Sequence, residues 1–236
     1  MVITRYENYN DIDVYFPEYD WTFYNSFYQN FKSGSIRCPY ERRYFGIGYL
    51  GEGYADTFVN SKMVKQYKIW SDLLRRCYDS KWYEKQPTYV NCTMCEEWHN
   101  YNTFYKWFDE NYYEIQGERV ALDKDILYKG NKLYSPETCV FVPQSINNLF
   151  VKRDAARGKY PIGVSYNKTK GRFQVRCNNE YKERIDLGDF NNPIDAFNEY
   201  KRFKELVIKK KADLCKDLIP EKLYEAMYKY EVEITD

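Results

Sequence analysis

The chain has 236 residues, of which 44% are apolar and 30% charged, and its formal net charge is +1 at neutral pH. A chain of this length and apolar content forms one large domain or two modest ones around a packed core. No apolar run approaches the roughly 18 residues that span a bilayer, and the first residues lack the basic and apolar pattern of a signal peptide. We therefore expect a cytoplasmic protein without a membrane partner.

The seven cysteines and the aromatic content predict a reduced, tyrosine-rich core. An odd cysteine count in a reducing compartment indicates free thiols. Cys92 and Cys95 have the spacing of a zinc knuckle, but the chain has no second such pair and only one histidine, His99. We therefore expect buried thiols and no zinc. Most of the 27 tyrosines are expected in the core, although tyrosine also stacks on bases.

The near-neutral total charge conceals a basic segment. Residues 151–216 carry 17 lysines and arginines against nine acidic residues. Residues 217–236 are acidic, with two basic residues against six, and residues 1–150 carry a small acidic excess. A basic stretch of this kind is typical of a phosphate-binding surface.

The first third of the chain contains no decisive motif. Residues 1–35 are rich in tyrosine and phenylalanine, and residues 38–53 form a segment interrupted by Gly46, Gly48, Gly51 and Gly53. Such glycines also occur in loops that cradle phosphate, but the spacing fits neither the Walker nor the Rossmann pattern. Hairpin turns are the favoured interpretation.

Periodicity predicts the elements of the middle of the chain. Apolar residues recur at helical spacing over 61–79 and again over 96–113, and residues 88–92 read as a short strand. Residues 122–142 predict a hairpin, with the charged triplet Asp123, Lys124 and Asp125 ending its first strand and Gly130-Asn131 forming its turn. Residues 144–150 would then begin the next helix.

The pattern changes to period two in the basic segment. Residues 162–164, 172–177 and 181–187 alternate apolar and polar residues and predict three strands. Asn192 and Pro193 then predict the start of a helix that covers one face of the sheet, and residues 221–230 predict a last, acidic helix.

The other face of this sheet is predicted to bind DNA. Period-two geometry gathers cations and a glutamine on one surface, where arginine matches guanine edges and glutamine matches adenine edges. Exposed strands also carry cations simply to prevent edge pairing, but the clustering favours contact with double-stranded DNA. The candidate DNA-binding residues are Lys168, Lys170, Arg172, Gln174, Arg176, Lys182 and Arg184.

Two stretches resemble parts of phage homing endonucleases. One resemblance is to the Apetala-type (ethylene-response-factor) DNA-binding domain. It rests on four segments: GVS at 163–165, GRFQV at 171–175, LGDF at 187–190 and DAFNEY at 195–200. The other resemblance is to the HNH-type homing endonucleases of phages. It rests on the hairpin, on the pattern YxxWxxLxxRCY at 67–78 and on CEEW at 95–98.

The HNH resemblance implies a divalent ion, Mg²⁺ or Mn²⁺, that assists phosphodiester hydrolysis, with a histidine as the usual base. Asp123 matches the acidic metal ligand, and Asn148 or Asn147 matches the last ligand. Lys124 stands where typical members have histidine, and Thr138 stands where they have asparagine. A lysine is a poor general base at neutral pH. Asp125 could replace it, or the metal alone could activate water, and His99 is a further candidate for the site.

The sequence thus predicts an α+β protein with an HNH-like ββα-metal core and flanking helices, followed by a small three-stranded antiparallel sheet plus helix. The predicted segments are 1–43 (unassigned), 44–150 (nuclease core), 151–216 (Apetala-type module) and 217–236 (acidic helix and tail). Removal of residues 151–236 is expected to abolish DNA affinity and leave the core folded.

The leading hypothesis is a metal-dependent DNA endonuclease in the cytoplasm of a phage-infected bacterium. The alternative is a catalytically inactive relative that acts as a DNA-binding regulator, or as an anti-defence protein through DNA or a host protein. A third hypothesis is a module that uses its tyrosine-rich surfaces only for protein interaction.

Overall fold

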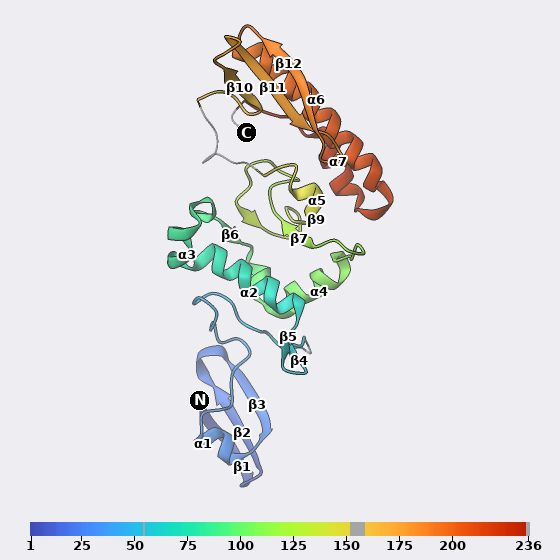
Figure 1. Ribbon diagram of the computed structural model, residues 1–236. Helices are drawn as coiled ribbons and strands as arrows, with labels where there is room; N and C mark the ends of the chain where they lie inside the picture. The colour runs from blue at the N-terminus through green and yellow to red at the C-terminus, as the bar shows by residue number, and fades with distance from the viewer. Residues whose placement is uncertain (54, 152–158, 235–236) are drawn as a thin grey trace. The chain divides into compact units, whose positions relative to one another are not determined.

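The computed structural model describes residues 1–53, 55–151 and 159–234. Helices account for 38% and strands for 26% of the structure, which confirms a mixed α+β class (Figure 1). The chain divides into two compact units: unit 1 is Met1–Tyr112 with Lys132–Glu137, and unit 2 is Tyr113–Asn131 with Thr138–Asp236. Within the described ranges, no helix is both long and apolar enough to cross a membrane.

Unit 1 begins with a three-stranded antiparallel sheet, in a region that contains no recognisable sequence motif. Its strands are β1 (Val2–Asn8), β2 (Asp11–Phe16) and β3 (Trp21–Ser26), in the order β1-β2-β3, followed by the short helix α1 (Tyr28–Lys32). A small core of Ile12, Val14 and Ile36 lies beneath the sheet. The sequence pattern did not predict these strands because they carry polar side chains that pair with one another across the sheet. For example, the Arg5 guanidinium donates to the Asp13 carboxylate at 2.7 Å.

The helical part of unit 1 differs from the predictions at its boundaries. The helix predicted over 61–79 is α2 (Lys65–Tyr78), because 58–63 forms the small hairpin of β4 (Phe58–Val59) and β5 (Lys62–Met63). Helix α3 (Ser80–Lys85) follows α2. The helix predicted over 96–113 is split into the 3₁₀ turn η3 (Glu96–His99) and α4 (Tyr101–Asn111), whose N-cap is Asn100.

The strand predicted over 88–92 was wrong. Residues Pro87–Tyr89 form the 3₁₀ turn η2, because Pro87 fixes the backbone at a helical φ. The strand in this region is β6 (Thr93–Met94), which pairs in parallel with β8 (Leu133–Tyr134). The glycine-rich segment 38–53 contains two isolated bridges, Tyr44 with Gly48 and Tyr49 with Asn100, and is otherwise loop.

Unit 2 contains the two strands of the predicted hairpin, but residues 124–139 connect them in place of the predicted turn at Gly130-Asn131. The short strand β8 lies in this connection and pairs with β6. Strand β7 (Val120–Asp123) pairs antiparallel with β9 (Val140–Pro143), and the short helix α5 (Gln144–Asn147) follows directly. The helix predicted over 144–150 therefore ends early, with Asn148 as its C-cap. Asp123 lies opposite Val140 at one end of the ladder.

The predicted three-stranded sheet is present in unit 2. Its strands are β10 (Val164–Asn167), β11 (Arg172–Asn178) and β12 (Arg184–Phe190), in the order β10-β11-β12. The first strand begins only after Gly163, whose φ of +75° brings it against the Tyr200 ring. The third strand lies three residues later than predicted, because the Asn179 side chain accepts the N–H groups of Tyr181 and Glu183 and holds 179–183 in a turn.

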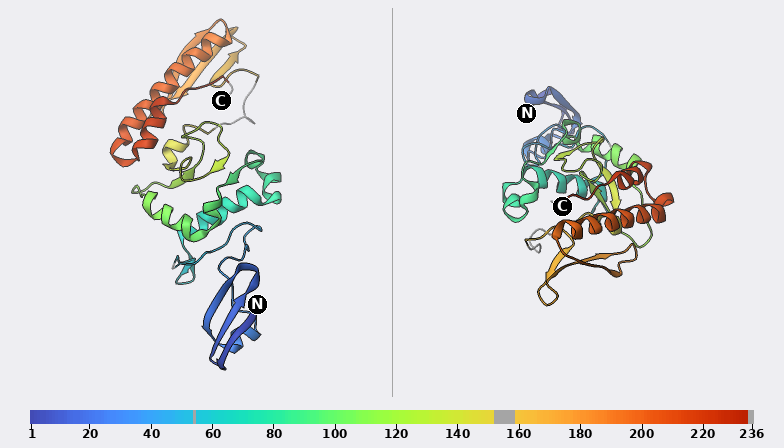
Figure 2. Two further views of the ribbon diagram at one scale, coloured as in Figure 1. Left: turned by 180° about the vertical axis from the view of Figure 1, so that it is seen from behind. Right: turned by 90° about the horizontal axis from the view of Figure 1, so that it is seen from above.

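One long helix, α6 (Pro193–Cys215), joins two hydrophobic cores of unit 2. Its first half packs Ala196, Phe197 and Tyr200 against the β10–β12 sheet, and Figure 2 shows the helix lying along one face of that sheet. Its second half packs with the hairpin and with α7 (Glu221–Lys229). The second core contains Ile126, Val140, Val142, Ile146, Ile208, Ala212, Cys215, Ile219, Leu223 and Met227. The hairpin and the sheet therefore both pack against the same helix, α6.

Candidate functional site

The acidic turn after β7 is the first candidate site. Asp123 ends the strand, and its Oδ1 accepts the backbone N–H groups of Asp125 at 2.9 Å and Ile126 at 2.8 Å. These bonds fold the chain back on itself and fix the carboxyl group at the strand end. Burial and, after it, the charge of Asp125 together raise the pKa of Asp123 to about 6.

Lys124 is tied into the loop rather than directed toward solvent. Its side chain is buried, and its Nζ donates to Asp125 Oδ2 at 3.1 Å and to the Asn131 carbonyl at 2.9 Å. In return, Asn131 Nδ2 donates to the Lys124 carbonyl at 2.8 Å. This reciprocal clamp closes the loop 124–131. Both of these contacts of the Lys124 side chain are hydrogen bonds that it donates within the loop.

The other residues carried over from the HNH pattern are separate from this turn. Asn148 is exposed, and its Oδ1 accepts from Gln144 at 2.9 Å. Within the described ranges, no hydrogen bond or ion pair joins Asn148 to Asp123. Thr138 lies two residues before the start of β9, with its hydroxyl 4.0 Å from Cys139 Sγ. His99 belongs to unit 1, where its Nε2 lies 3.2 Å from the Tyr78 hydroxyl and burial lowers its pKa.

Asp123 and Asp125 place two carboxyl groups in this turn, the kind of ligand that a hard divalent ion takes. Two carboxyl groups, Asp123 and Asp125, raise one another's energy when both are ionised, and a cation between them relieves that repulsion. Mg²⁺ is commonly held by one or two carboxylates, with water and substrate phosphate completing its shell. In the part of the chain that the structure describes, no group of three or more histidine, cysteine or acidic side chains is close enough to hold a metal. The seven cysteines are free thiols, six of them buried.

The uncovered face of the β10–β12 sheet is the second candidate site. Its outward positions on β11 are Arg172, Gln174 and Arg176, and on β12 they include Arg184. Arg172 and Arg184 are exposed, and their guanidinium groups form no hydrogen bond or ion pair with any described residue. These two groups are therefore available to a ligand.

In the middle of this face, a carboxylate of the same sheet neutralises part of the positive charge. The sequence alone did not predict this neutralisation. Arg176 Nε lies 3.6 Å from Asp186 Oδ2, and Gln174 Nε2 donates to the same oxygen at 3.3 Å. The predicted exposure of Gln174 was wrong, since this side chain is buried. The ion pair with Arg176 and, more strongly, the Gly188 N–H lower the pKa of Asp186. Asp186 was visible in the period-two pattern as an acidic residue on the outer face.

A second carboxylate reaches the same face through a bulge. The register shifts between Val175 and Arg176, where Gly188 adopts a φ of +109°, so that Asp189 lies opposite Gln174. Asp189 Oδ2 accepts from Lys170 Nζ at 2.6 Å. A bulge cannot be read from alternation alone, because it reverses the alternation locally.

Two of the candidate lysines lie in turns: Lys182 does so instead of lying on the predicted strand, whereas Lys168 lies between two strands as predicted. Lys182 has a φ of +69° in the turn before β12, and the neighbouring Tyr181 is 67% exposed instead of facing the helix. Lys168 lies in the turn between β10 and β11, where Asn167 Oδ1 accepts the N–H groups of Thr169 and Lys170. Both lysines are exposed. The cations thus lie at the two ends of the face and frame a neutral middle.

Comparisons of the chain with protein-family models, with curated proteins and with solved structures found no match. The resemblance to phage HNH homing endonucleases and to Apetala-type domains therefore stays a prediction from the quoted residues.

Proposed function

We propose that this chain is a double-stranded-DNA-binding protein of the phage HNH homing endonuclease type. The observation that carries the proposal is the pair of exposed, unpartnered guanidinium groups of Arg172 and Arg184 on a sheet whose other face is covered by α6. Guanidinium groups bind phosphate and guanine edges through two parallel hydrogen bonds. A two- or three-stranded ribbon of this size fits a major groove.

We further propose that the hairpin is an HNH-like core that assists phosphodiester hydrolysis. The order of β7, β9 and α5 supports this assignment, since a ββα unit is what the family resemblance implies. Asp123 and Asp125 would hold a Mg²⁺ or Mn²⁺ ion, which polarises a phosphodiester and lowers the pKa of a bound water. Lys124 keeps the loop closed around these carboxylates. Because α6 packs on both the hairpin and the sheet, docking of the sheet would position the hairpin.

A relative that binds DNA without cutting it is the second candidate. The contacts of Lys124 favour it, because the residue at the histidine position donates to Asp125 and to the Asn131 carbonyl within the loop. Such a protein would act as a regulator or an anti-defence factor by occupying DNA or a host protein. DNA binding would then be intact without turnover.

A plasmid-cleavage assay separates the two candidates. We expect the wild-type chain to nick or cut supercoiled DNA with Mg²⁺ or Mn²⁺ and to lose this activity with EDTA or in Asp123→Ala. Duplex binding in EDTA, measured in parallel, should be equal in both proteins. Binding without cleavage under any metal condition would remove the hydrolase proposal and keep the DNA-binding one.

A further inference from the structure

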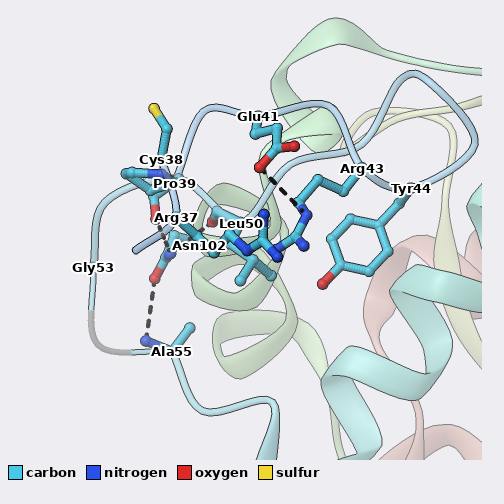
Figure 3. A pocket seen from close by; sticks show the side chains of 11 residues that line it. Arg37, Cys38, Pro39, Glu41, Arg43, Tyr44, Leu50, Gly53, Ala55 and Asn102 are labelled. Atoms are coloured by element: carbon cyan, nitrogen blue, oxygen red, sulfur yellow. Dashed lines mark hydrogen bonds and ion pairs between the residues drawn. The ribbon is translucent and has the colours of Figure 1, made fainter. Parts of the chain in front are cut away.

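Unit 1 contains a pocket that the proposed function does not use. Its volume is about 210 Å³, and it lies between the loop 37–44, the loop 50–55 and the start of α4 (Figure 3). The charged residues of the lining are Arg37, Glu41 and Arg43, and Asn102 adds an amide group. All of these residues belong to unit 1.

The side chains of this pocket leave a positive charge uncompensated. Arg43 Nε lies 3.4 Å from Glu41 Oε2, the ion pair drawn in Figure 3. Arg37 is exposed, and its guanidinium forms no hydrogen bond or ion pair with a described residue. The Cys38 thiol adds no negative charge, since burial raises its pKa. Two guanidinium groups and one carboxylate therefore line the pocket, and the carboxylate of the nearby Glu52 accepts a hydrogen bond from Trp21 Nε1.

The wall of the pocket opposite the arginines is rigid. Asn102 Nδ2 donates to the Leu50 carbonyl at 2.7 Å and to the Gly51 carbonyl at 3.3 Å, and its Oδ1 accepts the Ala55 N–H at 3.2 Å. Gly51 (φ +74°) and Gly53 (φ +152°) approach the asparagine side chains so closely that an added Cβ would lie 2.1 and 2.2 Å from Asn100 and Asn102 oxygens. The loop is therefore held in one conformation before any ligand arrives, which lowers the entropy lost on binding.

We propose that this pocket binds a phosphate group, and specifically a backbone phosphate of the DNA that the proposed function requires. Arginine is the side chain best suited to phosphate, because its planar fork donates two hydrogen bonds to two oxygens. Arg37, which has no partner among the described residues, supplies the charge, and Arg43, paired with Glu41, supplies a second fork. The exposed position of both arginines suits a group that arrives on a large polymer, whereas a small free ligand is usually enclosed by its site. This inference rests on the proposed function and adds to it a second DNA contact, made by unit 1.

The test compares Arg37→Ala and Arg43→Ala with Arg42→Ala, measuring duplex affinity by fluorescence anisotropy at several salt concentrations. Arg42 is an exposed arginine of the same loop that does not line the pocket, which makes it a matched control for charge. Each lost phosphate contact lowers the slope of log K against log salt by about one. We expect this reduction, with a several-fold loss of affinity, in Arg37→Ala and Arg43→Ala but not in Arg42→Ala. Glu41→Gln should strengthen binding.

Equal affinity and slope in the wild type, Arg37→Ala and Arg43→Ala would overturn the proposal, as would an equal loss in Arg42→Ala. Titration of the full-length chain with inorganic phosphate at constant ionic strength identifies the source of the phosphate. Saturable phosphate binding that is lost in Arg37→Ala, in a chain that binds no duplex, would refute the proposed function and keep the pocket as a free-phosphate site. Binding of neither would refute both. Because Arg37 is exposed and without a partner, Arg37→Ala should retain the wild-type thermal unfolding midpoint, which keeps the test independent of folding.

Discussion

The surroundings of the Asp123 carboxyl group in the hairpin oppose its ionisation. Burial and the charge of Asp125 raise its pKa from 3.8 to about 6, although two backbone N–H groups stabilise its ionised form. Folding therefore favours the protonated form of Asp123. This contribution to the free energy of unfolding is fully present below the unfolded pKa and is lost as pH rises through about 6.

We expect Asp123→Asn to be more stable than the wild type at pH 8 in EDTA, by at most about 3 kcal/mol, and equally stable at pH 4. Asparagine keeps the Oδ1 acceptor of the turn and removes the ionisable group, so that the difference reports the charge. Urea unfolding at both pH values measures it. Identical pH profiles for the two proteins would show that the Asp123 pKa is ordinary. Addition of Mg²⁺ at pH 8 should then stabilise the wild type alone.

Lys124 provides a second test at the residue scale, because its contacts are structural. Lys124→Ala removes two hydrogen bonds of a buried ammonium group and should lower the free energy of unfolding by about 1–3 kcal/mol. Any cleavage activity should fall only in proportion to the folded fraction, as measured by circular dichroism at the assay temperature. A fully folded variant without activity would instead assign Lys124 to the chemistry.

At the scale of the element, the arginines of the β10–β12 sheet should differ in their effect on DNA binding, because among the described residues Arg176 is paired with a carboxylate and Arg172 and Arg184 are not. Arg172→Ala and Arg184→Ala should each weaken duplex binding by about 1 kcal/mol or more. Arg176→Ala should have a smaller effect, since Asp186 already neutralises that group in part. Asp186→Asn should strengthen binding. Equal losses at all three arginines would show that the intramolecular ion pair has no influence on recognition.

The β10–β12 sheet also shows how far sequence reasoning reaches. Alternation of apolar and polar residues is enough to predict that β11 exposes Arg172 and Arg176 on one face. It cannot predict that the bulge at Gly188 moves Asp189 onto that face, because a bulge depends on the pairing of two strands. The two strands of the hairpin followed from the acidic triplet and from the apolar run before Pro143. The predicted turn at Gly130-Asn131 was wrong as their link, because residues 124–139 connect them and include β8, which pairs elsewhere. The Lys124–Asn131 clamp did not follow from the sequence, because it arises only when the loop has closed.

Helix α6 makes a second prediction at this scale. Ile208 is fully buried in the core that α6 shares with the hairpin, and Leu206 on the same helix is 42% exposed. Ile208→Ala should destabilise unit 2 by about 3 kcal/mol, and Leu206→Ala, the matched control, by far less. All five tryptophans lie in residues 1–112, so tryptophan fluorescence reports unit 1. The Ile208→Ala unfolding curve should shift when followed by circular dichroism and stay in place when followed by fluorescence.

For the whole molecule, the shared core changes the expected result of truncation. Removal of residues 151–236 deletes α6 and α7, which cover Ile126, Val140, Val142 and Ile146 of the hairpin. The remaining chain should therefore expose this apolar surface, in place of the intact core that the sequence predicted. Binding of a hydrophobic dye and low solubility of the 1–150 fragment would report the exposure. A fragment that is monomeric and protected from proteolysis over 113–150 would show that the hairpin folds without α6.

The salt dependence of duplex binding is the most direct test of a DNA-binding function. The wild-type chain should bind a duplex with an affinity that falls steeply with salt, since each neutralised phosphate releases counterions. The double variant Arg172→Ala/Arg184→Ala should lower the log–log slope by about two while its thermal unfolding midpoint stays unchanged. A slope identical to that of the wild type, or no duplex binding by the wild type at low salt, would contradict the function assigned to this sheet.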